Sequence, residues 1–196
     1  MRKTISILSS FTIILLAAIS ACNTGSNKTQ SAATAVSKDS LIKRGAYLVT
    51  IGGCDDCHSP KKMGPMGPEV DPELRLSGFP ASRPLPKFDS NFAKKGLMMM
   101  NEDGTAAAGP WGISFTGNLT SDATGAGSWP VENFVTALRK GKLKGHQGGR
   151  DLLPPMPWQN YSQMTDDDLR ALHAFLQSTK PVENIVPAPK QFADLK

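Results

Sequence analysis

Residues 54–58 read Cys-Asp-Asp-Cys-His, and this motif restricts the fold of the chain more than any other feature. Two cysteines three positions apart, followed at once by histidine, are typical of c-type haem attachment. The motif predicts that Cys54 and Cys57 form thioether bonds to one haem c, and that His58 is an axial ligand of its iron. Such a chain must fold around a large, rigid and mostly apolar disc.

Two other kinds of site share part of this pattern. A thioredoxin-like redox pair has the same cysteine spacing, but it accompanies a βαβ unit, which this sequence does not predict. A structural zinc site needs a second pair of ligands. The third and last cysteine, Cys22, lies near the N-terminus and has a separate explanation. We therefore favour haem and expect no disulfide.

Residues 1–21 have the features of a bacterial lipoprotein signal peptide. A basic start precedes an apolar run over residues 5–19, which is short for a bilayer span of roughly 20 residues. Residues 19–22, Ile-Ser-Ala-Cys, resemble a lipobox, which predicts lipidation of Cys22. We expect an exported lipoprotein anchored to a membrane, on the periplasmic side or in the cell envelope. The alternatives are an ordinary signal peptide that leaves Cys22 unmodified, or an uncleaved anchor.

The charge balance does not favour nucleic-acid binding. The chain has 22 basic and 17 acidic residues, for a net charge of +5, and two of the basic residues lie in the signal peptide. The mature chain would therefore carry only +3, whereas nucleic-acid binding requires a strong, clustered basic patch. Its length suits one domain with tails. Residues 22–39 have no apolar periodicity and are predicted to form a flexible tether.

Apolar periodicity predicts three helices. The first covers about residues 40–51, and Gly45 on its buried face predicts a close crossing with another helix. The second covers about residues 130–140 and ends at Gly141. The third begins at Thr165, whose hydroxyl can cap it. We expect the first and last helices to cross and to pack on the haem.

Residues 59–129 are different, because they contain eight prolines and ten glycines and show almost no sustained periodicity. A loop of this length is unusual inside a compact domain. A haem changes that judgement, since loops can wrap around it and pack on it. The sequence therefore predicts an all-α fold with a long Pro/Gly-rich loop region.

The second axial ligand is predicted to be Met156. It lies in residues 152–158, Leu-Leu-Pro-Pro-Met-Pro-Trp, where three prolines restrict the backbone and can hold a thioether against iron. His146 and an open coordination position are the alternatives, while His173 is expected to be solvated. The other methionines after the first residue are interpreted as packing residues, or as too close to His58 to reach the second position: Met63, Met66, Met98, Met99, Met100 and Met164.

These residues together resemble a class I cytochrome c, a monohaem protein. The similarity is to small bacterial lipoprotein cytochromes and to the cytochrome c subunits that serve periplasmic dehydrogenases. It covers most of residues 41–186. The segments that carry it are residues 44–48, the motif at 54–58, residues 117–122 with Trp129, Gly141, residues 152–158 and residues 164–166.

The resemblance implies an all-α class I cytochrome c fold over residues 40–180, followed by a C-terminal extension at 181–196. It also implies that Trp111 or Asn118 lies near the haem propionates. Residues 61–109 match the family less well.

The function that the resemblance implies is transfer of single electrons through a haem with histidine and methionine ligands, without catalysis by the chain itself. Expected partners are a dehydrogenase or a terminal oxidase or reductase. One alternative is a haem enzyme subunit or a gas or redox sensor with a labile sixth ligand. Another is a structural subunit in which haem only completes the fold. Pairs such as Lys61 and Lys62 either meet an acidic partner or form a solvated surface.

Overall fold

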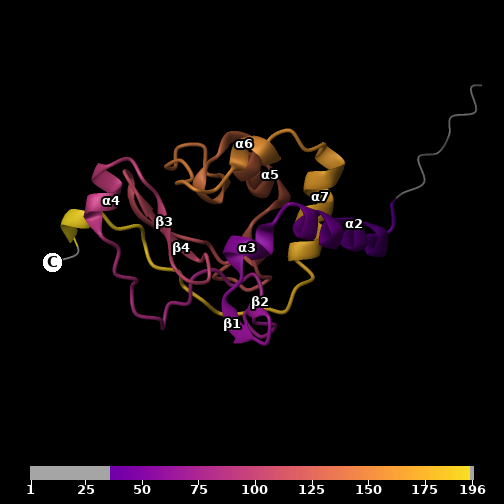
Figure 1. The fold of residues 1–196 in the computed structure, drawn as a ribbon. Coiled ribbons are helices and arrows are strands. Elements are labelled where there is room, and N and C mark those ends of the chain that lie inside the picture. The colour runs from indigo at the N-terminus through magenta and orange to yellow at the C-terminus, as the bar shows by residue number, and fades with distance from the viewer. Residues whose placement is uncertain (1–35, 195–196) are drawn as a thin grey trace, which may run out of the picture. The chain divides into compact units, whose positions relative to one another are not determined.

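Two helices far apart in the sequence cross in the computed structural model, which describes residues 36–194 (Figure 1). Helix α2 spans Lys38–Ile51 and helix α7 spans Asp166–Leu176. A Cβ atom on Gly45 would collide with the carbonyl oxygen of Ala171 and lie 2.5 Å from the Cβ of Phe175. Only glycine allows this approach, so the close crossing predicted at Gly45 is confirmed.

Polar contacts define the starts of both helices. The hydroxyl of Ser37 accepts a hydrogen bond from the Ser40 amide at 3.2 Å, so α2 begins two residues before the predicted start. The hydroxyl of Thr165 caps α7, as predicted, by accepting from the Asp168 amide at 3.1 Å. The Asp168 carboxylate also lies 2.9 Å from the guanidinium of Arg44 and so links the two helices.

Helix α5, Val131–Lys140, completes the helical core. It ends at Gly141, whose φ of 63° is the left-handed conformation that favours glycine at a helix end. Both features agree with the prediction. One apolar cluster joins the three helices, and its buried members are Leu48, Val49, Leu76, Phe134, Leu138, Leu169, Ala171, Leu172 and Leu176.

The prediction of an all-α fold is wrong, because two small antiparallel sheets interrupt the helices. Strand β1, Lys61–Gly64, pairs with β2, Gly67–Val70. Strands β3, Met99–Met100, β4, Ala106–Gly109, and β5, Gly112–Phe115, form the second sheet in the order β3-β4-β5. Each strand has only two to four residues, which is too short for alternating periodicity to stand out from loop sequence.

The remaining elements are short and connect these parts. Helix α3 spans Cys54–His58, α4 spans Ser90–Lys94, and α6 spans Trp158–Tyr161. Three single turns of 3₁₀ helix cover Ala126–Ser128, Leu143–Gly145 and Phe192–Asp194. No helix within residues 36–194 is long and apolar enough to cross a membrane.

The chain after α7 packs on the rest of the structure. The backbone of Lys190 pairs with that of Ile113 in β5, at 2.8 and 3.0 Å. The amide nitrogen of Asn184 donates to the carbonyl oxygens of Ser77 and Phe79, at 2.7 and 2.9 Å. Residues 181–190 are therefore fixed at several points.

The predicted signal peptide, residues 1–21, and the predicted lipidation site Cys22 lie outside the described residues. So does most of the predicted tether, residues 22–39. Its last two residues, Lys38 and Asp39, belong instead to the first turn of α2.

Candidate haem site

One mostly apolar cavity of about 450 Å³ brings the predicted site residues together. Cys54, Cys57, His58 and Met156 all line it, although about a hundred residues of sequence separate the motif from the methionine. Its walls come from α2, α3, α5, α7, the second sheet and the C-terminal segment. The volume falls in the range of roughly 300–1,000 Å³ that is usual for cofactor sites.

The motif itself forms helix α3, directly after α2. Gly53 has a φ of 64°, and this left-handed residue turns the chain between the two helices. Cys54 and Cys57 lie three positions apart in the helix, so both thiols are on one face and point to the same side. Both are free thiols in the structure. The hydroxyl of Tyr161 donates to the carbonyl of Gly52 at 2.6 Å and holds the start of this turn.

Burial suppresses ionisation of both thiols. It is the main cause that raises the pKa of Cys54 to about 11, and the carboxylate of Asp55 raises it further. Burial also raises the pKa of Cys57, although the positive charge of Lys61 opposes that rise. Both shifts favour the protonated thiol over the thiolate that a redox-active Cys-x-x-Cys site requires.

His58 is oriented by a hydrogen bond from its other ring nitrogen. Nδ1 lies 2.8 Å from the carbonyl oxygen of Gly117. A carbonyl oxygen can only accept, so Nδ1 carries the proton and Nε2 keeps a free lone pair. Burial lowers the pKa of His58 and favours the neutral ring that binds metals. A second partner of this kind is usual for histidines that bind metals.

The Met156 segment is positioned by the second sheet. The hydroxyl of Ser114 in β5 donates to the carbonyl oxygen of Pro154 at 2.7 Å, two residues before the methionine. On the other side of Met156, the indole of Trp158 lies against Gly141, where a Cβ atom would collide with the ring. The rigid proline-rich segment was predictable from its residues, but the strand that anchors it was not.

Met164 also lines the cavity, so the structure offers two methionines there. The choice of Met156 rests on its proline-rich segment and stays a prediction. Met63 and Met66 do not compete, because they are 79% and 95% exposed. They lie on and beside the β1–β2 hairpin and are absent from the cavity lining.

The two remaining histidines lie away from the cavity. His146 is exposed and does not line it. His173 was expected to be solvated, but its Nε2 lies 2.9 Å from the carbonyl oxygen of Trp129, and its ring packs against Phe134 at 5.6 Å between centroids. His173 therefore joins α7 to α5 and its preceding loop.

The two predicted propionate contacts have different surroundings. Trp111 is not part of the cavity lining, and its Nε1 donates to the Ser114 hydroxyl at 3.2 Å. Asn118 lines the cavity, but its amide nitrogen donates to the hydroxyl of Thr124 at 3.1 Å and to the carbonyl of Val182 at 2.8 Å. Both amide hydrogens of Asn118 are thus used within the protein, one to hold its own loop and one to hold the C-terminal segment.

Sequence reasoning missed three contributors to the site: Ser114, Tyr161 and the apolar segment Ile185-Val186-Pro187-Ala188-Pro189, which lines the cavity. A hydrophobic run with two prolines beyond the last helix was the available signal for that segment. Ser114 and Tyr161 had none, because their partners are distant backbone carbonyls.

The donor set and its surroundings fit a haem better than a simple metal ion. Among residues 36–194, no three His, Cys, Asp or Glu side chains converge as a metal site would require. The cavity instead combines two thiols, an oriented imidazole and a thioether with a large apolar wall. Those are the groups that a covalently attached haem requires.

Comparisons with known proteins point in the same direction. No protein-family model matches the chain. The chain is 30% identical over 146 residues to the gluconate 2-dehydrogenase cytochrome c subunit of Pantoea cypripedii, covering 74% of this chain and 24% of that protein. It is 29% identical to the cytochrome c subunit of the quinone-dependent alcohol dehydrogenase of Gluconobacter oxydans, with coverages of 74% and 23%. It is 36% identical over 89 residues to the fructose dehydrogenase cytochrome subunit of Gluconobacter japonicus, with coverages of 44% and 17%.

The chain spans only about a quarter of the length of the first two relatives. The relatives' names agree with what the motif and the cavity predict. The chain is therefore similar to the cytochrome c subunits of dehydrogenases.

Proposed function

We propose that this protein is an electron carrier with one covalently attached haem c. The observation that carries the proposal is the single apolar cavity lined by both cysteines of the motif, His58 and Met156. The similarity to cytochrome c subunits of dehydrogenases supports it independently. The chain would transfer single electrons between partners and would not itself transform a substrate.

Each site residue has a defined part in this proposal. Cys54 and Cys57 would hold the haem covalently, and the Nε2 atom of His58 and the sulfur of Met156 would bind its iron. Bound haem c supplies a reversible one-electron couple between ferric and ferrous iron. Two protein ligands leave no coordination position for a substrate. The apolar walls exclude water and disfavour the additional charge of the ferric state, which raises the reduction potential.

The proposal extends to location and partners. Export followed by lipidation of Cys22 would anchor the protein to a membrane on the periplasmic side or in the cell envelope, with the residues between Cys22 and α2 as a tether. The expected redox partner is a dehydrogenase, because the relatives named above are cytochrome subunits of gluconate, alcohol and fructose dehydrogenases. A terminal oxidase or reductase would then accept the electron.

The first experiment is expression of the full chain in cells that mature c-type cytochromes. The expected product is red, and its haem stays bound to the polypeptide after denaturation. A matched variant, Cys54→Ala with Cys57→Ala, should lose covalent haem, whereas Cys22→Ala should keep it and lose only membrane attachment. A colourless wild-type protein would refute the proposal.

A second experiment addresses the sixth ligand. The Met156→Ala variant should keep its haem, show a lower reduction potential and bind carbon monoxide rapidly in the ferrous state. Met164→Ala is the control, and its ligand binding should stay like that of the wild type. If the wild-type protein itself binds carbon monoxide rapidly, the position is open, and an enzyme subunit or a sensor becomes the better interpretation.

A further inference from the structure

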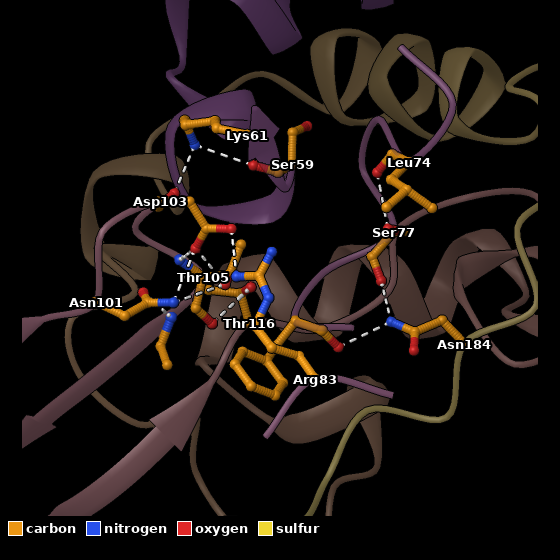
Figure 2. Close-up of polar contacts among 12 residues, drawn as sticks. Ser59, Lys61, Leu74, Ser77, Arg83, Asn101, Asp103, Thr105, Thr116 and Asn184 are labelled. Atoms are coloured by element: carbon orange, nitrogen blue, oxygen red, sulfur yellow. Dashed lines mark hydrogen bonds and ion pairs between the residues drawn. The ribbon is translucent and has the colours of Figure 1, made fainter. Parts of the chain in front are cut away.

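Lys61 follows the motif by three residues and points inward, into a group of backbone carbonyls. Its ammonium lies 2.7 Å from the carbonyl oxygens of both Asp56 and Asp103, 3.0 Å from that of Ser59 and 3.2 Å from that of Asp55. Figure 2 shows the side chain reaching toward Ser59 and Asp103. An ammonium has three hydrogens, so four acceptors use all of them.

The neighbouring Lys62 provides a contrast. Both residues belong to strand β1, in which successive side chains point to opposite faces. Lys61 is partly buried, and Lys62 is exposed. The two lysines therefore do not form one charged surface pair. Of the two, only Lys62 is exposed for contact with an acidic partner protein.

The positive charge of Lys61 acts on the Asp55 carboxylate from a distance but has no carboxylate in direct contact among the described residues. Within residues 36–194, no carboxylate lies at ion-pair distance from its ammonium. The two nearest candidates have other partners: Asp55 pairs with Arg75 at 2.7 Å, and Asp103 pairs with Arg83 at 2.6 Å. Asp56 is exposed, so water and salt screen its charge.

This charge is held directly against the attachment turn. Asp55 and Asp56 lie between the two cysteines, and their carbonyl oxygens contact the ammonium. The Asp103 carbonyl belongs to the turn between β3 and β4, and the next residue, Gly104, packs so closely that a Cβ atom would lie 2.7 Å from the Asp56 oxygen. Lys61 thus joins the second sheet to α3 and keeps a fixed charge beside the cavity.

We propose that Lys61 is a positioning residue whose fixed positive charge raises the reduction potential of the haem carried by α3. This inference rests on the proposed electron-carrier function. Ferric haem carries one more positive charge than ferrous haem, so a nearby cation disfavours the oxidised state. The effect grows as water is excluded, and the ammonium of Lys61 is partly buried among backbone carbonyl groups.

The test compares Lys61→Gln and Lys61→Met with Lys62→Gln as the matched control, in the haem-loaded full chain. Redox titration should show a lower midpoint potential in both Lys61 variants, with a several-fold smaller ferrous fraction at the wild-type midpoint. Lys62→Gln should leave the potential unchanged. Added salt should reduce the difference but not abolish it, because Lys61 is partly buried.

Glutamine separates charge from structure, because its amide still donates hydrogen bonds to the carbonyls. A wild-type potential in Lys61→Gln would overturn the proposal. If the variants fail to accumulate, acylation of amines in the wild-type protein gives a direct answer: Lys62 should react quickly and Lys61 slowly. Equal reaction of the two lysines would overturn the inference. If the wild-type chain binds no haem, the proposed function fails first, which is a distinguishable result.

Discussion

The helical core and the inserted sheets are stabilised in different ways. The core of α2, α5 and α7 rests on an apolar cluster and one close glycine contact. The region between α3 and α5 has few periodic apolar residues and depends on buried polar networks. Three side chains each form several hydrogen bonds there, those of Asp103, Asn118 and Asn184. Some of their partners are distant in the sequence, and others lie in the same turn. The helical core is thus defined mainly by packing, whereas the inserted region combines buried side chains such as Phe79 and Ile113 with satisfied hydrogen bonds.

The largest expected effect is in the helical core. Gly45→Val would force a side chain into the Ala171 carbonyl and Phe175 and so separate α2 from α7. We expect a loss of at least about 3 kcal/mol in the free energy of unfolding. Denaturant titration measures it. Gly148→Val is the control, since nothing lies within 4 Å of that position, and it should change stability by about 0.5 kcal/mol or less. Similar losses of unfolding free energy in the two variants would contradict the close crossing of α2 and α7 at Gly45.

The next effect is in the inserted region. Asp103→Ala removes the acceptor of Arg83 at 2.6 Å and of the Thr105 hydroxyl at 2.6 Å. Breaking a buried pair leaves its partners unsatisfied, so we expect a loss of about 2–3 kcal/mol. Asp151→Ala is the matched control, because its pair with Lys142 is exposed and worth at most about 1 kcal/mol. If both changes cost the same, the buried network does not stabilise this region.

The same carboxylate gives an acid dependence. Burial tends to raise the pKa of Asp103, but the hydroxyl of Thr105 and the charge of Arg83 together hold it below its ordinary value. The unfolded chain then binds the proton more readily, so this stabilisation is complete above the ordinary carboxyl pKa of about 4. It is lost as the pH falls through the lower value of the folded protein. The free energy of unfolding, measured from pH 6 to pH 2, should therefore fall less with decreasing pH in Asp103→Asn than in the wild type.

The smallest expected change in stability connects the two halves. Ser114→Ala removes the hydrogen bond from β5 to the Pro154 carbonyl and should cost about 1 kcal/mol. Its clearer result is functional, because a loosened segment would let Met156 leave the iron more often. Carbon monoxide binding by the ferrous protein should become faster. Ser178→Ala, at an exposed hydroxyl, should not change it. An unchanged rate of carbon monoxide binding in Ser114→Ala would show that the second sheet does not hold Met156 in place.

This contrast also explains what the sequence could and could not predict. The three main helices were predictable because their caps and their 3.6-residue periodicity are local signals, as at Thr165 and Gly141. The motif and the proline-rich segment around Met156 were recognisable for the same reason, and the structure places both at one cavity. The sheets were not, because strands of two to four residues carry no measurable alternation.

The inward direction of Lys61 was equally hidden. The sequence shows two adjacent lysines, and only the fold shows that Lys61 reaches back to the carbonyls of the motif and across to that of the distant Asp103. Asn118 is a similar case, because its partners Thr124 and Val182 are brought to it by the fold. Residues whose role depends on backbone atoms far along the chain leave no pattern in their own neighbourhood.

The last described segment affects how this protein can be dissected. Residues 185–189 form part of the cavity wall, while Asn184 and Lys190 fix the chain on either side. A fragment that stops at residue 180, where the helical core ends, would keep every predicted ligand and yet leave the cofactor exposed to water. Shortened versions of this chain are therefore poor substitutes for the whole protein in any measurement that depends on a dry interior.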